Sequence, residues 1–140
     1  MKRTADARWN GDIMKGTGTM RLGSGAYEGK YSFGSRFEQD PGTNPEELIG
    51  AAHAGCFSMA LSGALGKAGH APESIETHAV VHLEKQEGGF AITGIGLTTK
   101  ARVPGISKEA FLEHAEGAKK NCPVSKALAA VPIRLDATLI

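Results

Sequence analysis

Residues 44–67 read NPEELIGAAHAGCFSMALSGALGK, and this stretch decides how the chain folds. Asn44 is a favourable helix N-cap, and Pro45 suits the first helical position because a missing N–H costs nothing there. Glu47 stands three residues after Asn44, the spacing of a capping box. The stretch therefore predicts a helix from Pro45 to about Lys67.

This helix has an unusual composition. No Asp, Glu, Lys or Arg occurs between Leu48 and Leu65, and nearly every face is apolar or small, which is typical of a helix buried almost all round. A helix of about 23 residues spans roughly 35 Å, the full width of a small domain. One short domain could hardly enclose it. The sequence therefore predicts a homodimer in which a second subunit covers this helix.

Shorter strand and helix patterns lie on both sides of this helix. Alternating residues bounded by Gly-rich turns predict strands, and Ser or Pro ahead of an apolar stripe predicts helices. The expected elements are an antiparallel meander over 4–12 and 17–37, with Tyr27–Phe37 as its last strand, a hairpin of strands 74–84 and 90–103, helices 108–120 and 123–129, and a strand over 131–140. The order β-β-β, α, β-β, α, α, β predicts an α+β fold and a single domain over residues 1–140.

The composition excludes several classes of function. With 41% hydrophobic and 22% charged residues, the chain resembles an ordinary soluble globular protein. A formal net charge of +1 gives no electrostatic case for nucleic acid or an anionic membrane. No stretch approaches about 20 continuous apolar residues, so no membrane span is expected. The start of the chain lacks the apolar core of a signal peptide. With only two cysteines, the expected compartment is a reducing cytoplasm, where a disulfide is transient or catalytic.

The two cysteines have different local contexts. Cys122 precedes Pro123 at the expected start of a helix, where unpaired N–H groups and the helix dipole favour a thiolate. The alternative is a small residue that fills a gap between two helices. Cys56 lies in the middle of the apolar helix, so burial should raise its pKa. Its local context favours inert core packing, and as a nucleophile it would need a cation from elsewhere in the fold.

Arg36 is a candidate for that cation, and Glu46 could hold it as a bidentate pair. The alternatives are a surface arginine and a carboxylate that favours the helix dipole. Glu46 and Cys56 are ten residues apart on one predicted helix, so they lie about 15 Å apart along its axis. If both act on one sulfur, either the helix is interrupted or the carboxylate comes from a second subunit. The second choice agrees with the burial argument.

The five histidines do not form a convincing metal site. His78 and His82 share one face of a strand, but about 13 Å separates them, which is too far to chelate one ion. His53, one helical turn before Cys56, could contact that sulfur, although a core or interface position is favoured. No Gly-rich segment has the order of a phosphate-binding loop.

Three stretches of the chain together strongly resemble the OsmC/Ohr family. They are Ser35–Glu38, the long run Gly42–Ala60, and Asn121–Ser125. The resemblance extends from Trp9 almost to the C-terminus. The position of Arg36, just before the helix motif, is similar to the OsmC branch more than to the organic-hydroperoxide-resistance branch.

That resemblance implies an intertwined α+β homodimer in which antiparallel sheets wrap around two long central helices. Cys56 matches the reactive cysteine of the family and Cys122 matches its resolving cysteine. Arg36 and Glu46 match its arginine and glutamate. Since the site of the family lies at the subunit interface, the resemblance also resolves the separation of Glu46 from Cys56.

The implied activity is a cysteine-based peroxidase of oxidative and osmotic stress defence. It would reduce organic hydroperoxides, and hydrogen peroxide less well, through a Cys56 sulfenic acid and a Cys56–Cys122 disulfide. A thiol or dithiol, a lipoyl-type one among the candidates, would reduce that disulfide. No metal, haem or flavin is needed. The apolar neighbours Phe57, Met59 and Leu48 would favour bulky hydroperoxides.

One tension and two rival functions remain at this stage. Helix-terminus reasoning makes Cys122 the more acidic thiol, whereas the resemblance makes Cys56 the attacker, because an interface arginine can outweigh one helix terminus. One rival is a general dithiol–disulfide oxidoreductase that acts on proteins. The other is a non-enzymatic dimeric module that binds a hydrophobic ligand and whose cysteines are structural.

Overall fold

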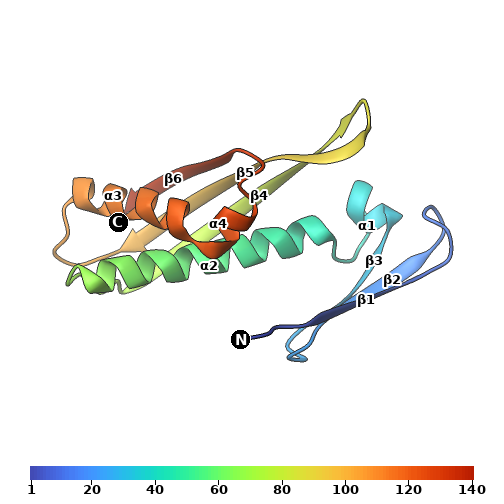
Figure 1. The fold of residues 1–140 in the computed structure, drawn as a ribbon, viewed down its shortest axis with the longest axis horizontal. Helices are drawn as coiled ribbons and strands as arrows, with labels where there is room; N and C mark the ends of the chain where they lie inside the picture. The colour runs from blue at the N-terminus through green and yellow to red at the C-terminus, as the bar shows by residue number, and fades with distance from the viewer. The chain divides into compact units, whose positions relative to one another are not determined.

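The computed structural model describes all 140 residues, which divide into two compact units. The first unit is Met1–Leu48 and the second is Ile49–Ile140. Figure 1 labels the helices and strands of both. The fold is mixed α+β, as the sequence predicts. Each unit contains one three-stranded sheet.

The first unit is an antiparallel meander followed by a short helix (Figure 1). β1 (Ala5–Asn10), β2 (Thr17–Leu22) and β3 (Glu28–Ser32) pair in the order β1-β2-β3. Gly11, at φ 94°, and Asp12, whose carboxylate accepts two backbone N–H groups, turn the chain between β1 and β2. The predicted meander is confirmed.

The end of the predicted third strand is a helix instead. α1 (Phe33–Phe37) follows β3 directly because Ser32 and Ser35 form a capping box. The Ser35 N–H donates to Ser32 Oγ at 3.2 Å, and the Ser32 N–H donates to Ser35 Oγ at 2.9 Å. The prediction of a strand over Tyr27–Phe37 is therefore wrong for its last part. Arg36 consequently lies on a helix.

α2 (Pro45–Lys67) begins and ends where the sequence predicts. Asn44 Oδ1 accepts the N–H of Glu47 at 2.8 Å, which confirms the N-cap. At the other end Gly69, at φ 85°, ends the helix with hydrogen bonds typical of a Schellman motif. The boundary between the two units falls within α2.

By length and composition alone, α2 could cross a membrane. Its most apolar 18-residue window has a mean hydropathy of 1.4, and 28% of that window is buried within the chain. The sequence contains no long continuous apolar run because Gly and Ser interrupt the apolar residues of this helix without adding charge. Core helices of soluble proteins have the same composition. Most residues of this window are exposed or only partly buried within the chain.

The sheet of the second unit has the strand order β4-β5-β6. β4 (Ser74–Gln86) and β5 (Gly89–Arg102) form the predicted hairpin, with an irregularity between His82 and Leu83. β6 (Ile133–Leu139) pairs with β5 in parallel, which the sequence did not predict. The parallel pair arises because a helical connection carries the chain back to the other end of β5.

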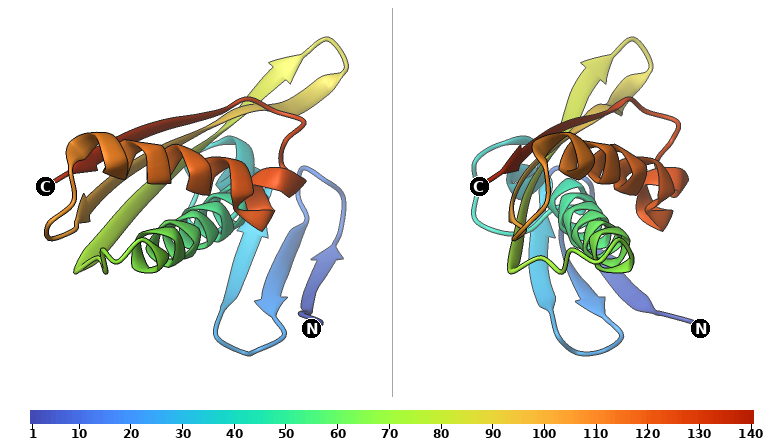
Figure 2. Two further views of the ribbon diagram at one scale, coloured as in Figure 1. Left: turned by 60° about the vertical axis from the view of Figure 1, so that its left-hand side comes forward. Right: turned by 90° about the vertical axis from the view of Figure 1, so that its left-hand side faces the viewer.

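Two helices make that connection. α3 (Lys108–Asn121) begins at the predicted N-cap Ser107, whose hydroxyl accepts the Ala110 N–H at 3.2 Å. α4 (Pro123–Ala127) starts at Pro123 as predicted but is shorter than expected. Figure 2 shows α3 and the main part of α2 on the same face of the sheet.

The core of the second unit lies between that sheet face and the two helices. Alternate residues of β5 point into it, and α2 and α3 contribute one stripe each. Its buried apolar residues are Phe57, Leu61, Leu65, Ile95, Leu97, Ala101, Val103, Phe111, Ala115 and Ala118. Packing on one common sheet face fixes α2 and α3 relative to each other, and each of these helices carries or adjoins one of the two cysteines.

Candidate active site

The two cysteines meet in the second unit although 66 residues separate them in the sequence. Cys56 lies in the middle of α2, and Cys122 joins the end of α3 to the start of α4. Their sulfur atoms are 2.6 Å apart, and both thiols are free. Because a disulfide bond is about 2.05 Å long, little movement would convert this pair into one. The fold thus brings the two cysteines together, which the local sequence around each of them could not predict.

The helix junction holds Cys122 in place. Its backbone N–H donates to the Ala118 carbonyl at 2.9 Å and completes α3, while its carbonyl accepts the Lys126 N–H at 3.1 Å and starts α4. The Cys122 side chain is fully buried, whereas Cys56 is partly exposed. A small molecule from solvent therefore reaches Cys56 more easily than Cys122.

The two thiols differ in acidity. Burial raises the pKa of Cys56, and its contact with the Cys122 thiol raises this pKa further, against a weaker effect of the Val124 backbone. Burial also raises the pKa of Cys122, but hydrogen bonds from Cys56, Ser125 and Val124 outweigh burial and lower it. Within this unit Cys122 is the more acidic thiol, in agreement with its position at a helix N-terminus.

A buried histidine adjoins this pair of thiols. His53 lies one turn before Cys56 on α2, is fully buried, and places Nε2 2.7 Å from Ser125 Oγ. Its Nδ1 has no hydrogen-bond partner, and burial lowers its pKa from the ordinary value of 6.5. The sequence favoured a core or interface position for His53 but did not identify Ser125 as its partner, because the contact joins residues 72 positions apart.

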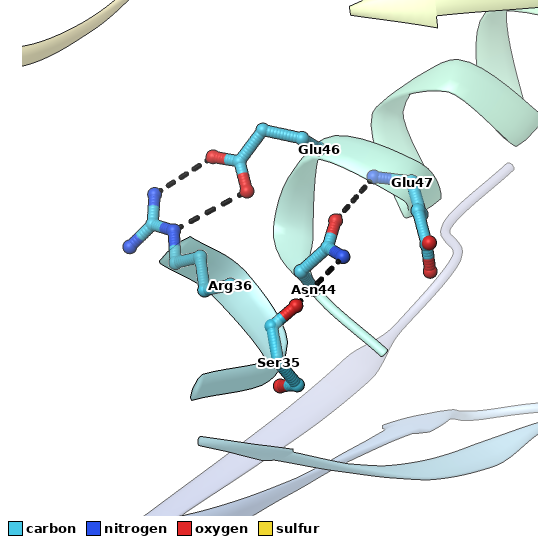
Figure 3. A network of polar contacts seen from close by, with 5 residues as sticks. All are labelled: Ser35, Arg36, Asn44, Glu46 and Glu47. Carbon is cyan, nitrogen blue, oxygen red and sulfur yellow. Dashed lines mark hydrogen bonds and ion pairs between the residues drawn. The ribbon is translucent and has the colours of Figure 1, made fainter. Parts of the chain in front are cut away.

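Arg36 and Glu46 form a bidentate ion pair in the first unit (Figure 3). Arg36 Nη2 is 2.8 Å from Glu46 Oε1, and Arg36 Nε is 3.2 Å from Glu46 Oε2. The glutamate side chain is 9% exposed and the arginine side chain 35%. The guanidinium also lies over the Phe37 ring, 5.1 Å from its centre. Two of its five N–H groups bond the carboxylate, so the others can still meet an anion.

Local hydrogen bonds hold this ion pair. Asn44, which caps α2, also donates from Nδ2 to the Ser35 carbonyl of α1 at 3.2 Å (Figure 3). The Ser35 hydroxyl in turn donates to the Thr43 carbonyl at 2.8 Å. These bonds tie the helix that carries Arg36 to the first turn of the helix that carries Glu46. These hydrogen bonds therefore hold Arg36 and Glu46 in a fixed position relative to each other.

The charged pair lies in the first unit and the thiol pair in the second. The helix α2 runs without interruption from Glu46 in its first turn past Cys56 in its middle. Of the two ways in which both pairs could act on one sulfur, an interrupted helix is therefore wrong.

The apolar neighbours expected near Cys56 point in different directions. Phe57 is fully buried in the core of the second unit. Met59 is 78% exposed and Leu48 is partly buried. Of these three side chains, Met59 is thus the one most open to solvent.

His78 and His82 occupy exposed alternate positions of β4. They share one face, as the sequence predicts. No group of three or more His, Cys, Asp and Glu side chains is arranged to hold a metal ion.

Comparison with known sequences identifies the family to which the chain is similar. Residues 38–136 match the sequence model of the OsmC-like protein family. The chain is 52% identical over 135 residues to the peroxiredoxin OsmC of Escherichia coli strain K12, which covers 96% of this chain and 94% of that one. It is 33% identical over 91 residues to the organic hydroperoxide resistance protein OhrB of Bacillus subtilis, covering 64% of this chain and 65% of that protein.

Solved structures agree with these sequence matches. The crystal structure of OhrB from Bacillus subtilis superimposes with a TM-score of 0.71 at 27% identity, covering 96% of this chain and 97% of that one. An OsmC-like protein from Mycoplasma pneumoniae has a TM-score of 0.78 at 16% identity, covering 100% and 98%, and supports the fold alone.

The fold, the two thiols in contact and the relatives together define a thiol-dependent peroxidase. The chain belongs to the OsmC/Ohr family, as the resemblance of its three motifs implied.

Proposed function

We propose that this chain reduces organic hydroperoxides to alcohols, with Cys56 as the attacking thiol and Cys122 as the resolving thiol. The observation that carries the proposal is the 2.6 Å contact between the two sulfur atoms. Catalysis by this route needs a nucleophilic thiolate and a second thiol within bonding reach of it. The similarity to OhrB, named for organic hydroperoxide resistance, supports the substrate class.

The first step is attack of the Cys56 thiolate on the terminal peroxide oxygen. The O–O bond breaks, the alkoxide takes a proton and leaves as an alcohol, and Cys56 becomes a sulfenic acid. The partial exposure of Cys56 supports its role as the attacker, since a hydroperoxide reaches it more easily than the fully buried Cys122.

The second step joins the two sulfurs. Cys122 attacks the sulfenic sulfur of Cys56, the S–O bond breaks, and the hydroxide leaves as water after protonation. A thiol or dithiol reductant, with a lipoyl-type dithiol among the candidates, then restores both thiols by exchange. In the reducing cytoplasm, the compartment we propose, such a disulfide persists only as an intermediate.

Arg36 supplies the cation that Cys56 needs. Burial and the contact with Cys122 raise the pKa of Cys56, so a nearby positive charge is required to favour its thiolate. Glu46, which holds Arg36, lies about 15 Å along α2 from Cys56 of the same chain. We therefore assign the Arg36–Glu46 pair of one copy to the cysteines of a second copy.

This assignment requires a homodimer, which the exposure of α2 supports. The helix has no charged residue between Glu47 and Lys67, yet several of its small or apolar residues are exposed in one chain. They include Ala51, Ala52, Gly55, Met59 and Gly63. We propose that residues 1–140 act as one domain and that a second copy covers this surface.

Gly55 offers a direct test of the dimer. A Cβ at Gly55 meets no atom within 4 Å in one chain, so Gly55→Glu should fold but place a charge against a partner. We expect the variant to sediment as a monomer and to lose peroxidase activity. Gly88→Glu, at the β4–β5 turn with equally open space, is the matched control. A monomeric wild type, or a dimeric Gly55→Glu, would contradict the proposed interface.

Steady-state assays test the substrate class. With a dithiol reductant, cumene hydroperoxide should turn over faster than hydrogen peroxide, and a protein disulfide should be a poor substrate. Preference for the protein disulfide would favour a general oxidoreductase. Full function without either thiol would favour a binding module.

A further inference from the structure

His53, Ser125 and Cys122 form a buried polar chain that the two-thiol chemistry does not explain. His53 and Cys122 are fully buried, and Ser125 is 4% exposed. His53 Nε2 lies 2.7 Å from Ser125 Oγ, and Ser125 stands in the first turn of α4, directly after the N-cap residue Cys122. A buried imidazole with an unpartnered nitrogen is costly in a core, so a role beyond packing is indicated.

The single hydrogen of the Ser125 hydroxyl can point only one way at a time. If Nε2 carries the proton of a neutral imidazole, His53 donates to Ser125 and the hydroxyl hydrogen is directed at the Cys122 sulfur. If Nε2 is bare, the hydroxyl donates to His53 instead. A thiolate at Cys122 therefore selects the arrangement in which His53 donates.

The surroundings favour a neutral imidazole in this chain. Burial lowers the pKa of His53, so the imidazole adds no charge, and it can donate to Ser125 in the tautomer that carries its proton on Nε2. The groups that act on the Cys122 sulfur are Cys56 of α2 and Val124 and Ser125 of α4. His53 lies behind Ser125 in this set. Of all these groups, only Cys56 and His53 can change their protonation state.

We propose that His53 and Ser125 are positioning residues for the second thiol: His53 orients the Ser125 hydroxyl so that it donates to the Cys122 thiolate. The inference rests on the proposed function, in which this thiolate attacks the Cys56 sulfenic acid. There the S–S bond forms, the S–O bond breaks, and the departing hydroxide becomes water with the proton that Cys122 gave up. The same hydrogen bond stabilises Cys122 as the leaving thiolate when a reductant attacks Cys56.

The first experiment needs no peroxide. In a Cys56→Ser background, the Cys122 thiolate is titrated by ultraviolet absorbance and by its rate of alkylation. Ser125→Ala should raise the measured midpoint by about one pH unit, the size expected for loss of a hydrogen bond to a charged group. His53→Phe should raise it less. His53→Gln, whose amide can donate to Ser125, should restore it.

Thr99→Val is the matched control for loss of a buried hydroxyl. Thr99 is fully buried, and its hydroxyl bonds Thr77 and the Glu76 carbonyl. It should leave the titration unchanged. An unchanged midpoint in Ser125→Ala would overturn the proposal, and this variant decides the matter even if His53→Phe fails to fold.

The second experiment separates electrostatic from structural effects. One equivalent of hydroperoxide is added, and conversion of the Cys56 sulfenic acid to the disulfide is followed. At pH values below the titration midpoint of the Cys122 thiol, this conversion should be about tenfold slower in Ser125→Ala than in the wild type. The two rates should converge at alkaline pH, where Cys122 is ionised in both proteins. Equal slowing at every pH would contradict the proposal. If the wild type does not react with hydroperoxide at all, the proposed function fails while the titration still tests the hydrogen bond.

Discussion

The Arg36–Glu46 pair and the Cys56–Cys122 pair are built in opposite ways. The charged partners are ten residues apart and are tied together by caps and loop hydrogen bonds within the first unit. The thiols are 66 residues apart and meet because α2 and the α3–α4 junction pack on one sheet. Local bonds thus determine the first pair, and long-range packing determines the second.

The largest expected effect comes from removing the attacking thiol. Cys56→Ser should lower peroxidase turnover by at least about a thousandfold, because the nucleophile is lost. Cys122→Ser is the informative partner variant: it should still oxidise Cys56 once but accumulate the sulfenic acid, which a dimedone adduct detects by mass. Rapid first-turnover consumption of peroxide by Cys56→Ser would reverse the two roles.

Removing the cation should have the next largest effect on rate. Arg36→Met should slow oxidation of Cys56 by about a hundredfold, as expected when a preorganised charge is lost. Arg36→Lys should recover only part of the rate, since lysine cannot form the bidentate pair. Single-turnover kinetics measure this. Arg21→Met, which breaks an exposed pair with Asp6, is the control and should react at the wild-type rate.

A core substitution tests the dependence of the thiol pair on packing. Leu61 is fully buried on α2, so Leu61→Ala should lower the free energy of unfolding by about 2–5 kcal/mol. Urea unfolding measures the loss. Under partly destabilising conditions the variant should also form the disulfide more slowly, because α2 and the α3–α4 junction hold the sulfurs in contact. A stability within 0.5 kcal/mol of the wild type would contradict this account of the core.

A cap substitution gives the matching test of the locally built pair. Asn44 caps α2 and also bonds the Ser35 carbonyl, so Asn44→Ala should cost about 1 kcal/mol of stability. It should slow Cys56 oxidation modestly through a less rigid Arg36, and it should leave Cys122 titration as in the wild type. Loss of thiol contact in this variant would show that the two pairs are not built independently.

The smallest expected effect is a pH dependence of stability from His53. Burial lowers its folded-state pKa below the ordinary 6.5, so the unfolded chain binds more protons in the window just below pH 6.5. This contribution is fully present above that pH and is lost as pH falls through the window toward the folded pKa. Urea midpoints between about pH 8 and pH 5 should fall less in His53→Gln than in the wild type. If the urea midpoints of the two proteins changed with pH by the same amount, a buried neutral His53 would be contradicted.

The sequence predicts α2 well because its signals are local. Asn44, the uncharged run and Gly69 each act within a few residues, and both ends of the helix are correct. The same locality explains the one error in the first unit. Alternation up to Phe37 predicted a strand, while the Ser32–Ser35 capping box, a stronger local signal, produced α1.

Residues that meet across the fold could not be derived from their neighbours in sequence. The contact of Cys56 with Cys122, the bond of His53 to Ser125 and the parallel pairing of β6 all depend on how α3 and α4 return the chain. Local reasoning did rank Cys122 as the more acidic thiol, which agrees with its hydrogen bonds. For Cys56 it offered Arg36 only as a candidate cation, because the neighbours of Cys56 in sequence carry no positive charge.

The central claim is that peroxide links the two thiols that the fold brings together. The direct measurement adds one equivalent of cumene hydroperoxide to the reduced protein, counts free thiols, and maps the peptides by mass. The account predicts loss of both thiols and a peptide pair joined through Cys56 and Cys122 of one chain. Retention of both free thiols after the peroxide is added would contradict it.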